Sequence, residues 1–255
     1  MAPDDRYLLF IDILGFRQLV QKNSADQIYE KLDACLCTHH DYERLNSAFS
    51  TIYFSDSIIF WQRVPGYRRK HFLDMCSISS TIFTSLLSQN IPLRGAVSFG
   101  QFVVKRDSAD RHDVFFGNAL IEAYETQEKE NWLGMVVCPS AWLPYENEKP
   151  NIDSLIREGI ILRRKTDDHL LVNPCRHIGV AYQAWKTTKQ ISFTNNQDLI
   201  NEILSLQFIV TQVEGFSSKG DFTGRAAIKY FATLKFLEDI LGKDCMEWAG
   251  AIFSE

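Results

Sequence analysis

The stretch that decides the fold is Tyr7-Leu8-Leu9-Phe10-Ile11-Asp12-Ile13-Leu14-Gly15-Phe16, a short apolar run that carries a single acid. Its apolar character predicts a buried strand over residues 6–12, and Gly15 allows the tight turn that ends it. A carboxylate in such surroundings is costly to desolvate unless a cation or hydrogen bonds compensate it. We therefore expect Asp12 to have a charged partner.

A second apolar run with one acid follows, Thr51-Ile52-Tyr53-Phe54-Ser55-Asp56-Ser57-Ile58-Ile59-Phe60. Residues 48–53 and 58–61 are rich in β-branched and aromatic side chains, which predicts two strands. The polar residues between them predict a hairpin turn, with Asp56 in the turn.

The order of the first elements predicts the topology. Helical spacing begins near residue 24, a second helix is predicted over residues 72–87, and a long strand over residues 93–104. Strand, helix, strand, strand, helix, strand is the order of a ferredoxin-like βαββαβ sheet in an α+β fold. In that topology the hairpin tip returns beside the end of the first strand, so Asp12 and Asp56 meet.

The rest of the chain predicts additional elements around this core. Pro174 marks a boundary, which gives a core domain over residues 5–173 and a helical C-terminal extension over 174–255 that packs on the core or on a second subunit. The elements expected are a helix over 119–129, a strand over 133–137, a hairpin over 159–172, and helices over 180–187, 198–213 and 226–241.

Composition places the chain among globular proteins. Of its 255 residues 45% are apolar and 23% are charged, and no uninterrupted apolar stretch is long enough to span a bilayer. The start Met-Ala-Pro-Asp-Asp-Arg lacks the basic and apolar regions of a signal peptide. We expect a cytoplasmic protein without a membrane partner.

The charge distribution argues against nucleic acid as a partner. The net charge is −5, and phosphate backbones are bound by positive stripes. The basic triplets Arg68-Arg69-Lys70 and Arg163-Arg164-Lys165 are too short for such a stripe, and we interpret both as solvated loop or hairpin edges.

The six cysteines are scattered, which indicates reduced thiols rather than a disulfide framework. The densest group is Cys35, Cys37, His39 and His40. Helical residues two apart point to different faces, so an ordinary helix is favoured there over a zinc site.

Two acids at one edge of a small sheet suit a pair of divalent cations, Mg²⁺ or Mn²⁺, held about 3.5 to 4 Å apart. Magnesium shares only one or two carboxylates and takes its other ligands from water and substrate phosphates. Asp12 and Asp56 would suffice, with the backbone carbonyl of Ile13 as a further ligand. The plain alternative is that Asp56 is an ordinary turn residue and Asp12 a helix cap.

The quoted motifs resemble class III nucleotide cyclases over residues 5–173, with their order kept. Residues 10–16 are similar to the first metal motif of that family, and residues 54–57 lie where it has the second metal aspartate. Residues 94–100 are similar to its arginine-bearing strand, and residues 116–120 to the start of its dimer helix. The resemblance implies a head-to-tail homodimer with composite active sites.

The sequence departs from the purine cyclases at the positions that read the base and stabilise the transition state. The asparagine and arginine of their dimer helix are replaced by Ile121 and Glu125. Their adenine-reading lysine is replaced by Ile52, and their base-reading aspartate by Val114, with Asp113 one step away. Purine specificity is therefore unsupported.

With these departures, the chain resembles the pyrimidine cyclases of bacterial Pycsar antiphage defence. The resemblance rests on Phe54-Ser55-Asp56-Ser57, Arg94-Gly95-Ala96-Val97-Ser98-Phe99-Gly100, Ala123-Tyr124-Glu125 and Lys229-Tyr230-x-x-Thr233. It implies a uridylate or cytidylate cyclase whose messenger activates a separate effector. The residues leave UTP and CTP open, and we favour UTP.

The resemblance assigns roles to further residues. Gly15 and Phe16 would contact substrate, and Arg94 would act in catalysis on a phosphate or the base carbonyl, unless it forms an ion pair at the strand edge. Tyr53 would narrow the base pocket to a single ring, unless it packs in the core.

Three other functions share parts of this pattern. A palm-type polymerase would need a more basic surface, and a GGDEF diguanylate cyclase would need its signature in the hairpin. The third is a degenerate cyclase-fold module that binds nucleotide or serves as a scaffold without catalysis. The missing asparagine and arginine favour this module, while the retained acids Asp12 and Asp56 argue for an enzyme.

Overall fold

The computed structural model describes residues 4–37, 49–66, 69–106, 113–146, 151–189 and 196–252. Of the cysteine–histidine group, His39, His40 and the side chains of Cys35 and Cys37 lie outside the described residues.

A seven-stranded sheet in the order β2-β3-β1-β4-β7-β9-β8 forms the centre of the fold. β1 is antiparallel to both of its neighbours, β3 and β4, and β2 pairs with β3 at the edge. This is the strand order of a ferredoxin-like βαββαβ unit. The predicted α+β fold is confirmed. The strands are β1 (Asp5–Ile13), β2 (Phe49–Phe54), β3 (Ser57–Gln62), β4 (Leu93–Gln101), β7 (Gly134–Val137), β8 (Ile161–Arg163) and β9 (Leu170–Val172).

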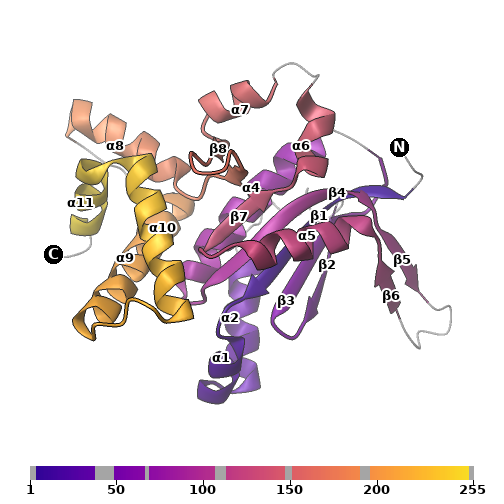
Figure 1. Ribbon diagram of the computed structural model, residues 1–255, viewed down its shortest axis with the longest axis horizontal. Helices are drawn as coiled ribbons and strands as arrows, with labels where there is room; N and C mark the ends of the chain where they lie inside the picture. Colours follow the sequence, from indigo (N-terminus) through magenta and orange to yellow (C-terminus); the bar gives the residue numbers. More distant parts are fainter. Residues whose placement is uncertain are drawn as a thin grey trace.

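Helices cover both faces of the sheet (Figure 1). α4 (Arg69–Ser88) lies against one face and buries residues such as Phe72, Met75 and Leu86. α5 (Asn118–Lys129) lies against the other face, where Ala119 and Ala123 pack on Leu8 and other buried residues. α2 (Ala25–Cys37) contacts α4. Side chains alternate along β1, so successive residues enter opposite cores.

The expected strand over residues 93–104 is divided in two. β4 ends at Gln101, and β5 (Val103–Arg106) pairs instead with β6 (Asp113–Phe116) in a separate two-stranded sheet. The fully buried Phe102 lies at the break, where its N–H donates to the carbonyl of Asp4. The resulting arm is seen beside the main sheet in Figure 1.

Several short helices have no counterpart in the predictions. α1 (Phe16–Lys22) follows Gly15. The φ of 72° at Gly15 lets the chain turn sharply from the end of β1 into the helix. The others are α6 (Pro139–Glu146), α7 (Ile152–Arg157) and α11 (Lys243–Ala251).

A helical C-terminal extension is present, as predicted. It comprises α8 (Arg176–Thr188), α9 (Gln197–Ser218), α10 (Arg225–Leu241) and α11. α9 packs along α4, where the Ser205 hydroxyl donates to the Thr84 carbonyl and the Asn201 amide to Ser85 Oγ.

Among the described helices, none combines the length and the apolar character needed to cross a membrane.

Candidate active site

The two acid-bearing segments meet at one end of the sheet. Asp12 is the penultimate residue of β1 and lies opposite Ser57 in the β1–β3 ladder. The Ile13 N–H donates to the Asp56 carbonyl oxygen over 2.7 Å, which ties the hairpin turn to the end of β1. The meeting follows from topology, because β3 runs back along β1 from the turn.

The turn presents Asp56 to solvent. Ser55 has a φ of 56°, in the left-handed region that tight hairpin turns use, and Phe54 pairs with Ser57 on either side of it. Asp56 is exposed, and its side chain makes no hydrogen bond or ion pair within the described residues. It is therefore accessible to a ligand from outside.

Asp12 is paired with an arginine of the neighbouring strand, a pairing that the sequence did not predict. Arg94 donates from Nε to Asp12 Oδ2 over 2.9 Å, and both side chains are less than one-fifth exposed. Its Nη1 donates to the carbonyls of Glu128 and Glu130, at 3.2 and 3.1 Å. Arg94 therefore forms an ion pair at the strand edge, which was expected, without a named partner, as the alternative to a catalytic role. Its catalytic role stays a prediction.

Asp12 and Asp56 match the small number of ligands that a protein supplies to a magnesium or manganese ion. Oδ1 of Asp12 makes no hydrogen bond within the described residues, and the carboxylate of Asp56 faces solvent. In the described part of the chain no group of three or more His, Cys, Asp or Glu side chains is arranged so that it could hold a metal ion. Two carboxylates suit cations that take their remaining ligands from water and phosphates. The role of the Ile13 carbonyl stays a prediction.

The other predicted substrate residues surround this end of the sheet. Tyr53 is 47% exposed on β2, so it does not pack in the core. Gly15 lines a cavity beside α1, while the ring of Phe16 packs against the larger core. Ile52 packs against the smaller core on the α5 side.

Three of the four positions that differ from purine cyclases lie on the surface. Ile121 and Glu125 are exposed on α5, and Val114 is exposed on β6. Spaced by four residues, the two α5 residues share one face of the helix.

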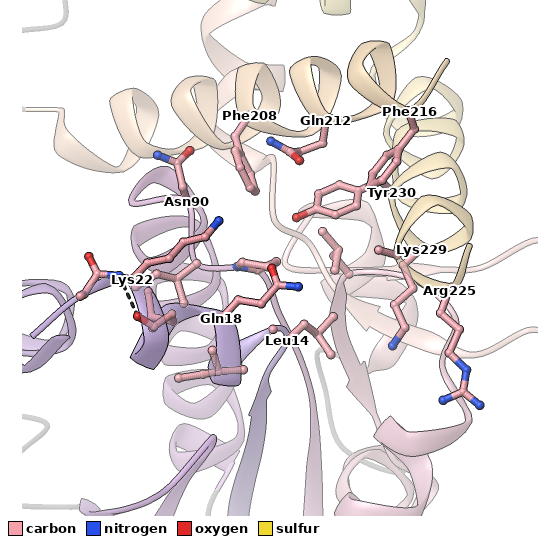
Figure 2. Close-up of a pocket in the computed structure, with 18 residues that line it drawn as sticks. Leu14, Gln18, Lys22, Asn90, Phe208, Gln212, Phe216, Arg225, Lys229 and Tyr230 are labelled. Carbon is pink, nitrogen blue, oxygen red and sulfur yellow. Dashed lines mark hydrogen bonds between the residues drawn. The ribbon is translucent and has the colours of Figure 1, made fainter. Parts of the chain in front are cut away.

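A cavity of about 560 Å³ opens next to these elements, between α1 and the extension (Figure 2). Lys22, Arg225 and Lys229 are its cationic lining residues. Burial lowers the pKa of Lys229 to about 8, and the charges of Arg94 and Arg225 add to this while Asp12 opposes it. The sequence marked Lys229 only as part of a motif, because nothing in the spacing brings residue 229 next to residue 12.

A cluster of buried charges around Glu130 was not predicted from the sequence either. Glu130, 7% exposed, accepts hydrogen bonds from both Nη atoms of Arg164 and one from the indole of Trp132. Burial lowers the pKa of Arg164, but its bonds to Asp167 and Glu130 outweigh this and raise it. The interpretation of this triplet as a solvated hairpin edge is wrong for Arg164, because its guanidinium neutralises a buried acid.

No protein-family model and no curated protein matches the sequence. Solved structures with a similar arrangement are nucleotide cyclase domains. The monomeric guanylyl cyclase domain of the RhoGC fusion protein from Blastocladiella emersonii has a TM-score of 0.49 at 11% identity, covering 67% of this chain and 95% of that one.

Two further structures are similar to the same degree. The adenylyl cyclase CyaB from P. aeruginosa has a TM-score of 0.46 at 14% identity, covering 66% of this chain and 91% of its own. The guanylate cyclase domain of RhGC from Catenaria anguillulae, in complex with GTP, has a TM-score of 0.45 at 12% identity, covering 66% and 93%. These values describe the arrangement of the chain and carry nothing about substrate.

Proposed function

We propose that the chain is a nucleotide cyclase that converts a pyrimidine nucleoside triphosphate to its 3′,5′-cyclic nucleotide and pyrophosphate. The observation that carries the proposal is the contact between the ends of β1 and the hairpin, which brings Asp12 and Asp56 to one edge of the sheet. Residues 5–173, with the motif order described above, form the catalytic domain in this proposal.

The reaction is a ring closure in which the ribose 3′ oxygen attacks the α-phosphorus and pyrophosphate leaves in line. Such phosphoryl transfer depends on positioning and charge neutralisation. Two divalent cations, when bound, lower the pKa of the attacking hydroxyl and neutralise the leaving phosphates. Asp12 and Asp56 would hold these cations. Arg94, bonded to Asp12, orients that carboxylate and stays a candidate for contact with phosphate or base.

The proposed base is a pyrimidine, with UTP favoured over CTP. The support is the apolar character of Ile52 and Val114, where purine cyclases carry charged base-reading groups. Tyr53 is half-exposed on β2, and in this proposal its ring limits the pocket to one ring of the base.

The active form in this proposal is a homodimer in which each subunit completes the site of the other. Large apolar side chains are 43 to 75% exposed on β2, on β6 and on α5, the helix whose start resembles the family's dimer helix. Exposed apolar groups of this size are commonly covered by a partner. They are Tyr53, Phe54, Val114, Phe116, Ile121 and Tyr124.

The resemblance to Pycsar cyclases supports a role in antiphage defence. In this role a cytoplasmic enzyme makes cyclic UMP or cyclic CMP, and the messenger activates a separate effector protein.

The direct test incubates the chain with each of the four ribonucleoside triphosphates, with Mn²⁺ or Mg²⁺, and resolves the products by chromatography. A cyclic pyrimidine nucleotide and equimolar pyrophosphate are expected. Asp12→Asn serves as the inactive control. A cyclic purine product would contradict the base assignment, and the lack of any cyclic product would contradict the reaction.

A second candidate, a nucleotide-binding or scaffolding module without catalysis, is favoured by one observation. Arg94 supplies Asp12 with a counter-charge from the protein itself, which is what a module that works without metals would need. For this module, binding of a nucleoside triphosphate measured by calorimetry would persist without divalent ions, and no cyclic product would form.

A further inference from the structure

The charged side chains that line the cavity beside α1 are all positive. Its walls come from the turn after β1, from α1, and from helices α9 and α10 of the extension (Figure 2). Lys22, Arg225 and Lys229 line it, and none of the described residues that line it is acidic. For a chain with a net charge of −5, a concave surface with three cations and no acid indicates an anionic ligand.

Lys229 is the cation that most needs a partner. Its side chain is half-buried and makes no hydrogen bond or ion pair within the described residues. The charges that act on it are those of Arg94, Arg225 and Asp12, so it lies within electrostatic reach of the candidate metal site. Removing an ammonium group from water without a counter-charge is costly, and a bound anion would offset that cost.

The helix that carries Lys229 is fixed to the end of the sheet. Thr233, one turn further along α10, accepts a hydrogen bond from the Leu133 N–H and donates one to the Lys229 carbonyl, both at 2.7 Å. The ring of Tyr230 packs against Phe208 and Phe216 of α9. The turn of α10 that carries Lys229 is therefore held by contacts on both sides, and Lys229 lines the cavity.

We propose that this cavity binds the polyphosphate of the nucleotide, with Lys229 and Arg225 as its ligands from the same chain. The inference rests on the proposed function and extends it: the phosphates beyond the reacting one run from the acids at the sheet end toward α10. A volume of about 560 Å³ lies within the range of small-molecule sites, about 300 to 1,000 Å³. The C-terminal extension then forms part of the active site, in addition to packing on the core.

Pyrophosphate, which is both the product and the polyphosphate alone, is the probe for the first test. Its binding to the full chain is measured by titration calorimetry in the absence of divalent ions. Lys229→Met and Arg225→Gln are each expected to weaken binding about tenfold or more, the usual effect of losing one charge-assisted hydrogen bond. Lys229→Arg is expected to retain most of the affinity.

The matched control is Lys235→Met, which removes the same charge from the exposed side of the same helix, away from this cavity. It is expected to leave pyrophosphate binding unchanged. Equal losses in Lys229→Met and Lys235→Met would reduce the effect to net charge and overturn the proposal. Circular dichroism checks that both variants are folded, and Lys229→Arg separates loss of charge from loss of fold.

Kinetics with the nucleotide identify the source of the phosphate. For the substrate, Lys229→Met raises KM and weakens inhibition by pyrophosphate. An unchanged KM beside lost pyrophosphate binding would mean that the cavity serves another phosphorylated molecule, and would overturn the assignment. If the wild-type chain forms no cyclic product from any triphosphate but binds pyrophosphate through Lys229, the anion site is supported and the proposed reaction alone fails.

Discussion

Asp12 and Arg94 lie directly opposite each other in the β1–β4 ladder, and Nε of Arg94 is 2.9 Å from Oδ2 of Asp12. Asp56, the other acid of the site, has no such partner among the described residues and is exposed. The two acids therefore have the same proposed function but different structural surroundings. Substituting each one should separate its effect on activity from its effect on stability.

Asp12→Asn and Asp56→Asn should both reduce cyclisation to the background rate, because each removes a charged metal ligand. Only Asp12→Asn should also lower the free energy of unfolding, by about 1 to 3 kcal/mol, because the mostly buried Arg94 loses its counter-charge. Product assays and denaturant unfolding measure the two effects. Full activity in either variant would contradict the metal assignment, and equal stability losses would contradict the different surroundings.

Arg164→Met should destabilise the fold by roughly 3 to 5 kcal/mol, because it leaves the carboxylate of Glu130 buried without its cation. The neighbouring Arg163 is exposed, so Arg163→Met is the matched control and should change little. Adding Glu130→Leu to Arg164→Met should recover part of the loss, since the uncompensated charge is then gone. Urea unfolding of the wild type and these three variants tests this. An Arg164→Met protein as stable as the wild type would refute it.

Thr233→Val should lower the free energy of unfolding by about 1 to 3 kcal/mol, because the Leu133 N–H loses its acceptor at a buried position. The shape of the side chain is retained, so the cavity left behind is small. Thermal unfolding measures the loss. Pyrophosphate titration should show weaker binding as well, since Thr233 holds the turn of α10 that carries Lys229; unchanged affinity would show that α10 is held by other contacts.

The stability of the C-terminal extension should depend on pH through His177. Glu202, 2% exposed, accepts hydrogen bonds from the His177 ring at 2.8 Å and from the Ile178 N–H at 2.7 Å. The bond to Glu202 raises the pKa of His177 above its usual 6.5. A raised histidine pKa gives stability that is complete below 6.5 and is lost as pH rises through the folded value.

Melting temperatures of the wild type and His177→Gln, measured from pH 5.5 to 8.5, check this expectation. The advantage of the wild type should be greatest at the acidic end and should shrink as the imidazole loses its proton. A difference that is constant across this range would show that the histidine does not titrate in contact with Glu202.

The sheet and the meeting of its two acids were accessible from the sequence. A continuous apolar run predicted β1, and runs rich in β-branched and aromatic residues predicted β2 and β3. The order of elements fixed which of them are neighbours, so that residues 12 and 56 came together without any side-chain information. Local signals also placed α4, α5 and the long helices of the extension to within a few residues.

What the sequence did not reveal depends on tertiary contacts. The strand breaks at Phe102 because that side chain enters the core, although the β-rich pattern continues past it. α1 has no buried residue and no side-chain cap, so neither periodicity nor capping announced it. Lys229 and Glu130 acquire their significance from Asp12 and Arg164, residues far away in sequence that only the fold brings near.

The cavity walls join segments that are far apart in the sequence, chiefly residues 13–23 and residues 208–230, together with residues 90–92 and Leu133. A chain is synthesised from its N-terminus, so the first wall leaves the ribosome long before the second exists. The pocket therefore cannot form before residues 208–230 have been synthesised, and a chain that stops short of them lacks it. If the chain is the proposed cyclase, such incomplete copies would lack its proposed polyphosphate site.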